Sequence, residues 1–263
     1  MLTQPACGRP ARFVGVSLKL YLGHVETLDW CRAVRDIVAG MPAVAENRLE
    51  VVVLPALTAL VSVVPILAPV GVGVGAQDLW VEDRGSFTGE VSGADLAAIG
   101  CRFAEIGHAE RRRIFCESDE LIRAKVSAAA RNGLVPLLCV GEDEHRNESD
   151  AAKACTLQLR AALGGLEGDV APSQIVVAYE PVWAIGADQA AAAGHIAAVC
   201  TGIKEWMAVE SAIRSVRVIY GGTAGEGLAT ELGDRVDGLF LGRSAHRPER
   251  LVRILNELAL REP

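Results

Sequence analysis

The sequence predicts a single-domain α/β fold built on a parallel sheet, and two observations carry this prediction. Eight short apolar runs rich in Val, Ile and Leu recur along the 263 residues, and none alternates cleanly with polar residues. Such runs are typical of strands buried on both faces. Helix-like segments separate most of the runs, so the pattern predicts a (β/α)8 barrel. Periodicity alone leaves an open, doubly wound sheet as the alternative.

The apolar runs are the expected strands, and helices are expected where apolar residues recur at helical spacing. The strands should cover residues 13–16, 51–54, 72–76, 103–106, 135–140, 175–179, 216–220 and 239–241. The helices should cover residues 28–39, 118–131, 149–163, 196–209, 226–232 and 248–260. Ser118 and Asn132-Gly133 are cap signals for the second of these helices, and Pro248 suits the first turn of the last.

Composition excludes several classes of protein. A hydrophobic fraction of 51% beside 22% charged residues supports a sizeable core and rules out disorder. The net charge of −7, from 26 basic and 33 acidic residues, argues against a nucleic-acid or anionic-membrane partner. Prolines interrupt the most apolar stretch, residues 49–75, so no membrane-spanning helix is expected there.

The N-terminus and the cysteines predict a cytoplasmic protein. Residues 1–12 contain no apolar segment before a cleavage site, so we expect a short flexible extension and one domain at 13–263. The seven cysteines are scattered, odd in number and without a C-x-x-C motif, which is typical of reduced core cysteines. The histidines outside the candidate site show no metal-ligand spacing, so no metal is expected.

Reactive side chains follow several strands at the ends where α/β folds place their active sites. These are Ser17 and Lys19 after the first strand, His108 and Glu110 after the fourth, and Glu180 after the sixth. Glycine-containing turns at 221–223 and 242–244 follow the last two strands. Such a set can remove a proton beside a carbonyl, polarise that carbonyl and hold a phosphate on backbone N–H groups.

Longer motifs around these residues resemble the triosephosphate isomerase family. They are AEIGHAERR (104–112), LLCVGE (137–142), VAYEPVWAIG (177–186), VIYGGT (218–223) and DGLFLGRSA (237–245). The segment GSFTGEVSGADL (85–96) resembles the interface loop of that family, and the match runs from about Val14 to Leu258. The resemblance implies a TIM barrel and a cofactor-independent phosphosugar isomerase that works through an enediolate.

The resemblance also implies a role for each catalytic candidate. Glu180 is expected to be the base, and neutral His108 is expected to donate a hydrogen bond to the enediolate oxygen. Lys19 should place its ammonium beside the phosphate and the developing oxyanion. Glu110 should hold Lys19 or relay a proton, with a salt bridge to Arg111 as the alternative.

Binding and assembly residues are carried over in the same way. Gly186, Thr223, Gly242 and Arg243 are expected to cradle the phosphate, and Cys139 to pack beside the base. A homodimer is implied, with Thr88 near the partner's active site and Glu90 pairing with Arg111 across the interface.

The chain departs from the family pattern near the substrate. Ser17 stands where the family carries asparagine, Thr223 where it carries serine, and Arg243 where it carries glycine. Asp78 replaces an asparagine, Ala109 replaces a serine, and the closing loop over 186–191 reads GADQAA instead of G-T-G-K-T/S-A. Because Lys19, His108 and Glu180 are retained, these changes put the shape of the substrate in question rather than the chemistry.

Three functions remain open on this evidence. The favoured one is implied by the resemblance, since some members of that family convert L-erythrulose 1-phosphate to D-erythrulose 4-phosphate. The smaller Ser17 makes room for the extra hydroxymethyl of this substrate on the carbon that loses its proton. The second is the ordinary interconversion of dihydroxyacetone phosphate and glyceraldehyde 3-phosphate. The third is a phosphosugar-binding protein without turnover, which would predict loss of Glu180 or His108, and both are present.

Overall fold

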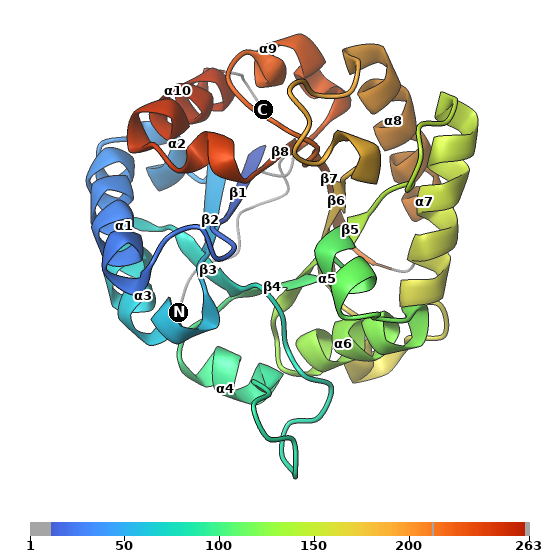
Figure 1. The fold of residues 1–263 in the computed structure, drawn as a ribbon, viewed down its shortest axis with the longest axis horizontal. Coiled ribbons are helices and arrows are strands. Elements are labelled where there is room, and N and C mark those ends of the chain that lie inside the picture. Colours follow the sequence, from blue (N-terminus) through green and yellow to red (C-terminus); the bar gives the residue numbers. More distant parts are fainter. Residues whose placement is uncertain (1–11, 212, 261–263) are drawn as a thin grey trace.

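The computed structural model describes residues 12–211 and 213–260. In it, eight parallel strands form a closed barrel in the order β1 to β8, with the helices outside (Figure 1). Val14 of β1 pairs with Val51 of β2 on one side and with Leu239 of β8 on the other, which closes the sheet. The predicted barrel is therefore confirmed, and the doubly wound alternative is wrong.

Each expected strand lies at its predicted place. The strands are β1 Arg12–Ser17, β2 Leu49–Leu54, β3 Gly73–Ala76, β4 Phe103–Ile106, β5 Val135–Val140, β6 Gln174–Tyr179, β7 Ser215–Tyr220 and β8 Gly238–Leu241. Since Arg12 already pairs with Leu49, the barrel begins one residue before the predicted boundary. The remainder of the predicted N-terminal extension, residues 1–11, lies outside the described residues.

The helices surround the strands. They are α1 His24–Ala39, α2 Pro42–Ala45, α3 Leu60–Leu67, α4 Gly93–Ala98, α5 Ala109–Ile114, α6 Asp119–Arg131, α7 Glu148–Leu163, α8 Ala193–Glu210, α9 Leu228–Leu232 and α10 Pro248–Ala259. The six predicted helices are all present. Helix α9 starts later than expected, because Gly227 before it takes a left-handed conformation with φ of 84°. Helix α3 contains Pro65 in the stretch that prolines interrupt, and it was not predicted.

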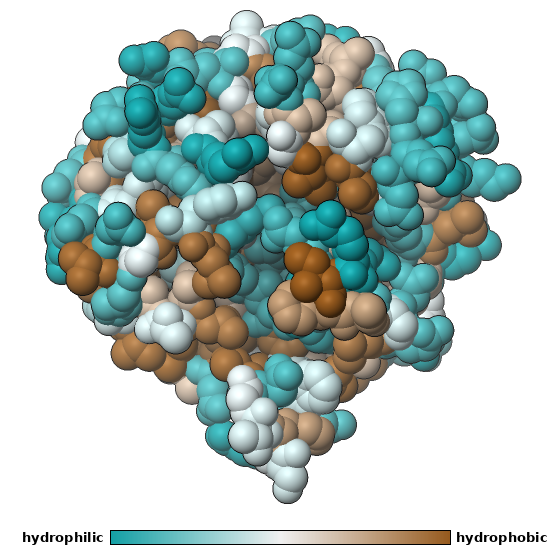
Figure 2. All heavy atoms as spheres, viewed as in Figure 1, coloured by the Kyte–Doolittle hydropathy of each residue, from teal (hydrophilic) through white to brown (hydrophobic). Residues whose placement is uncertain are grey.

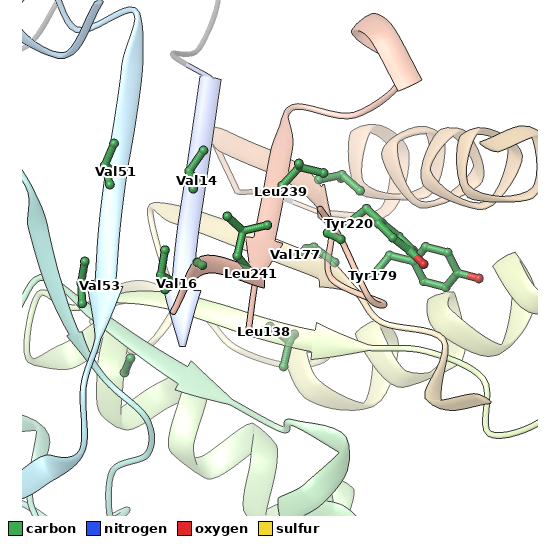
Figure 3. Close-up of a cluster of buried hydrophobic side chains, with 14 of the residues drawn as sticks. Val14, Val16, Val51, Val53, Leu138, Val177, Tyr179, Tyr220, Leu239 and Leu241 are labelled. Carbon is green, nitrogen blue, oxygen red and sulfur yellow. The ribbon is translucent and has the colours of Figure 1, made fainter. Parts of the chain in front are cut away.

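Two apolar layers hold the barrel together. The outer layer lies between strands and helices, and Figure 3 shows Val14 and Val16 of β1 beside Val51 and Val53 of β2 within it. The inner layer fills the barrel, where the rings of Phe13 and Phe103 meet edge to face with centroids 5.8 Å apart. The alternation of side chains along each strand sorts residues into these two layers.

The structure also bears on the expected core positions of the cysteines and on the apolar stretch at residues 49–75. Five of the six described cysteines are buried and all six are free, but Cys116 is exposed, so the prediction of a core position is wrong for it. Cys116 follows the short helix α5 with a φ of +55°, at a turn on the surface. Cys7 lies outside the described residues. Among the helices of residues 12–211 and 213–260, none is both long and apolar enough to cross a membrane.

Candidate active site

A cavity of about 540 Å³ opens at the carboxyl ends of the strands. All nine residues predicted to act in catalysis or substrate binding line it: Ser17, Lys19, His108, Glu110, Glu180, Gly186, Thr223, Gly242 and Arg243. Figure 2 shows hydrophilic residues around a hollow near the middle of this face. The barrel thus gathers groups up to 226 positions apart, because parallel strands end at the same rim.

His108 and Glu180 face each other across this cavity. The distance from His108 Nε2 to Glu180 Oε2 is 3.5 Å, and the two residues are 4% and 5% exposed. His108 also caps helix α5, where its Nδ1 accepts a hydrogen bond of 3.1 Å from the backbone N–H of Glu110. An accepting Nδ1 leaves the proton of the neutral imidazole on Nε2, aimed toward the carboxylate and the cavity. The pair can therefore combine a proton acceptor with a hydrogen-bond donor.

Lys19 lies on the same side of the cavity, in a left-handed backbone conformation with φ of 48°. Gln77 holds this turn by donating from Nε2 to the carbonyls of Lys19 and Leu54. Lys19 Nζ donates to Glu110 Oε1 at 2.9 Å. Burial works to lower the pKa of Lys19, but Glu110 outweighs it, with help from Glu180 and Glu105, and the pKa is raised. The ammonium therefore stays charged.

Glu110 holds Lys19, and the alternative pairing with Arg111 is not formed. Arg111 instead donates to Asp78 Oδ2 at 2.8 Å and to Glu117 Oε1 at 2.6 Å. Burial favours the neutral form of Glu110, but the hydrogen bond and charge of Lys19 prevail and lower its pKa. Both members of the Lys19–Glu110 pair are thus ionised near neutral pH.

The other end of the cavity suits a phosphate. Gly186 and Thr223 both line the cavity and take positive φ angles of 75° and 50°. Arg243 lies close to Gly186, since its Nη2 would be 3.6 Å from a Cβ on that residue. Within the described part of the chain, no carboxylate pairs with Arg243. An unpaired guanidinium beside glycine-containing turns is typical of an anion site.

A profile of the triosephosphate isomerase family matches residues 12–258. The chain belongs to the triosephosphate isomerase family. An L-erythrulose-1-phosphate isomerase of Pectobacterium atrosepticum is 47% identical over 244 residues, which cover 93% of this chain and 94% of that protein. A triosephosphate isomerase of Symbiobacterium thermophilum is 43% identical over 219 residues, covering 80% and 82%. The resemblance seen in the motifs is confirmed.

Solved structures agree with this membership. The triosephosphate isomerase of Bartonella henselae superposes with a TM-score of 0.78 at 30% identity, over 94% of this chain and 98% of that one. The chain is therefore a phosphosugar isomerase of the family.

Among residues 12–211 and 213–260, no group of three or more His, Cys, Asp or Glu side chains is placed to hold a metal ion.

Two hydrogen bonds anchor the segment between Glu180 and α8, which the sequence predicts to be a closing loop. At its start, Trp183 Nε1 donates to Glu142 Oε1 at 2.8 Å, and Tyr179 Oη shares that carboxylate at 3.1 Å. At its end, the backbone N–H of Ala191 donates to Tyr220 Oη at 3.1 Å. The residues between the two anchors border the cavity at Ile185 and Gly186, so their motion would open or cover it.

We expect residues 183–191 to become ordered when a phosphate-bearing ligand binds, because a closed loop excludes water from the enediolate. Hydrogen exchange at the backbone N–H of Ala191 should slow on addition of a phosphate analogue. Tyr220→Phe removes its acceptor, and a lost hydrogen bond of about 1 kcal/mol should speed that exchange roughly fivefold. Equal exchange with and without the analogue would refute a closing loop.

One carboxyl near the cavity was not predicted. Glu105 of β4 is 3% exposed, and its Oε2 accepts a hydrogen bond of 3.0 Å from Ser17 Oγ. Burial raises the pKa of Glu105 to about 7, against the opposing electrostatic influence of the His108 ring. Cys139 lies beside Glu180 as expected, and burial first, then the charges of Glu180 and Glu105, raises the pKa of its thiol.

Proposed function

We propose that the chain isomerises a four-carbon ketose phosphate, converting L-erythrulose 1-phosphate to D-erythrulose 4-phosphate. The observation that carries the proposal is Ser17, a small side chain that lines the cavity beside Lys19 and His108. The four-carbon ketose differs from dihydroxyacetone phosphate by a hydroxymethyl on the carbon that loses its proton. The 47% identical protein of Pectobacterium, named for this activity, supports the same choice.

The proposed mechanism uses only side chains and backbone groups of the cavity. Glu180 takes the proton from the carbon beside the carbonyl, and His108 Nε2–H stabilises the carbonyl oxygen as it becomes negative. Lys19 adds a positive charge near the same oxygen and the phosphate. Glu180 then returns the proton to the former carbonyl carbon. The neighbouring hydroxyl passes its proton to the former carbonyl oxygen and becomes the new carbonyl. Hydrogen moves within the substrate, so the step needs no cofactor.

The phosphate would be held at Gly186, Thr223, Gly242 and Arg243, which line one side of the cavity. Thr223 Oγ1 already donates to the carbonyl of Ala184 at 2.7 Å, so its backbone N–H rather than its hydroxyl is left for the ligand. Arg243 adds a fixed cation with two parallel N–H donors.

The ordinary three-carbon reaction remains the alternative function, favoured by the 43% identical triosephosphate isomerase of Symbiobacterium.

Turnover of L-erythrulose 1-phosphate and dihydroxyacetone phosphate, measured side by side, tests the proposal. The first should show the higher kcat/KM. Ser17→Asn adds two heavy atoms beside the reacting carbon, and we expect it to lower the ratio of four- to three-carbon kcat/KM on the order of a hundredfold. Ser244→Asn makes the same substitution at another serine that lines the cavity. It is the control and should leave the ratio near that of wild type. A wild-type preference for the three-carbon substrate would reject the proposal.

We further propose a homodimer built on the loop between β3 and α4. This loop projects beyond the ring of helices at the bottom of Figure 1. Thr88 and Glu90, both part of the loop, are exposed. Its base is held by a hydrogen bond of 2.8 Å from Trp80 N to Val91 O. Arg111 has five N–H donors, so its bonds to Asp78 and Glu117 leave capacity for Glu90 of a second subunit.

Light scattering at micromolar concentration should show a dimer. Glu90→Arg turns the proposed attraction to Arg111 into repulsion, and we expect it to raise the dissociation constant at least tenfold. Glu82→Arg places the same charge on an exposed residue of the same loop and serves as the control. An active monomer would contradict the proposal.

The free, mostly buried cysteines support a reducing, cytoplasmic location, which we propose as well.

A further inference from the structure

Glu105 is a buried carboxyl group on the inner face of the barrel. It follows Phe103 by two positions on β4, so the two side chains share the inward face of the strand. Phe103 packs in the inner cluster with Leu54, Leu137 and Ala178, and Glu105 lies one layer nearer the cavity. A buried carboxyl costs free energy that an apolar side chain in the same place would not. Stability therefore does not explain why this position carries a carboxyl.

The partner of Glu105 is a residue of the cavity. In the described part of the chain, the hydrogen bond from Ser17 Oγ is the one formed with this carboxyl. A serine hydroxyl has one hydrogen and two lone pairs. Because its hydrogen is directed to Glu105, Ser17 can offer only lone pairs to a ligand, and it would accept a hydrogen bond.

The pair also lies beside the reacting groups. The charges of Glu180 and Lys19 act on Glu105, and the charges of Glu105 and Glu180 act on the buried thiol of Cys139 on β5. Ser17 lines the cavity together with His108 and Glu180. A ligand atom held by Ser17 therefore lies next to the carbon on which Glu180 acts.

We propose that Ser17 and Glu105 form a subsite for a hydroxymethyl group on the reacting carbon. Ser17 Oγ accepts a hydrogen bond from the hydroxyl of that group, and Glu105 acts as a positioning residue that fixes the orientation of Ser17. A three-carbon substrate has only hydrogen at this place and gains nothing from the pair. The inference rests on the proposed four-carbon function and names the residues that determine it.

Glu105→Leu tests the subsite, because leucine fills a similar volume, removes the acceptor of Ser17 and avoids a buried charge. We expect kcat/KM for L-erythrulose 1-phosphate to fall on the order of a hundredfold, with a change below about fivefold for dihydroxyacetone phosphate. Glu105→Gln keeps a hydrogen-bonding partner for Ser17, so its loss should be about tenfold smaller. Ser17→Ala should match Glu105→Leu, and the double variant should lose no more than either single variant.

Leu54→Val is the matched control. It alters packing in the same inner cluster without touching a polar group, and it should leave the ratio of the two activities unchanged. Thermal unfolding of every variant checks that the barrel is intact.

The outcomes separate the two claims. Equal losses on both substrates in Glu105→Leu, or additive losses in the double variant, would overturn the subsite and leave the four-carbon function standing. A wild-type preference for the three-carbon substrate would overturn both.

Discussion

Glu180→Gln should lower kcat on the order of a thousandfold, because it removes the only carboxylate within 3.5 Å of His108 Nε2 among the described residues. Glu180→Asp should lower kcat on the order of a hundredfold, since retracting the carboxylate by about 1 Å spoils the geometry of proton transfer. KM should change little in both variants, because the phosphate contacts lie at the other end of the cavity. Steady-state kinetics on both phosphosugars would measure these effects.

The same experiment needs a control for the loss of a glutamate. Glu167→Gln removes an exposed carboxylate just before β6, at the end of the barrel opposite the cavity, and kcat should stay at the wild-type value. Inhibition by inorganic phosphate should be alike in all variants if Glu180 acts in chemistry rather than in binding. Wild-type turnover in Glu180→Asp would show that the base lies elsewhere.

The sequence predicted the barrel and its rim well because both depend on local pattern. Buried parallel strands read as unbroken apolar runs, and Lys19, His108 and Glu180 each follow such a run directly. Once the strands close in order, these three side chains must converge. For Glu110 the sequence favoured Lys19 as the partner and left Arg111 as the alternative. The structure decides between them, because Asp78 and Glu117 hold Arg111.

Glu105 was missed for a physical reason. It stands inside an apolar run, and its partner Ser17 is 88 residues away, so no spacing connects them. The signal that could have found it is the carboxyl itself, since a charged residue in the middle of a fully buried strand needs an explanation. Helix α3 was missed because Pro65 reads as a helix breaker, although it falls late in a helix of 8 residues.

The stability of the fold should depend on pH through Glu105. Burial raises the pKa of Glu105 from 4.5 to about 7, and the charge of Glu180 adds to the rise while His108, Ser17 and Lys19 oppose it. Between pH 4.5 and about pH 7, the Glu105 carboxyl keeps its proton in the folded protein and has lost it in the unfolded chain. Stability from this group is therefore complete below pH 4.5 and declines as pH rises to about 7. The full change amounts to about 3 kcal/mol.

Glu105→Gln isolates this contribution, because glutamine resembles the protonated carboxyl and does not titrate. The variant and wild type should be about equally stable near pH 4.5, and the variant should be more stable by about 3 kcal/mol at pH 8. Denaturant unfolding at one protein concentration, repeated across this range, gives the difference directly, and groups common to both proteins cancel. A difference that stays constant with pH, or that shrinks as pH rises, would mean that Glu105 ionises in the folded barrel as readily as in water. The carboxyl would then face Ser17 as an anion throughout, and the decline in stability would have to come from another buried group.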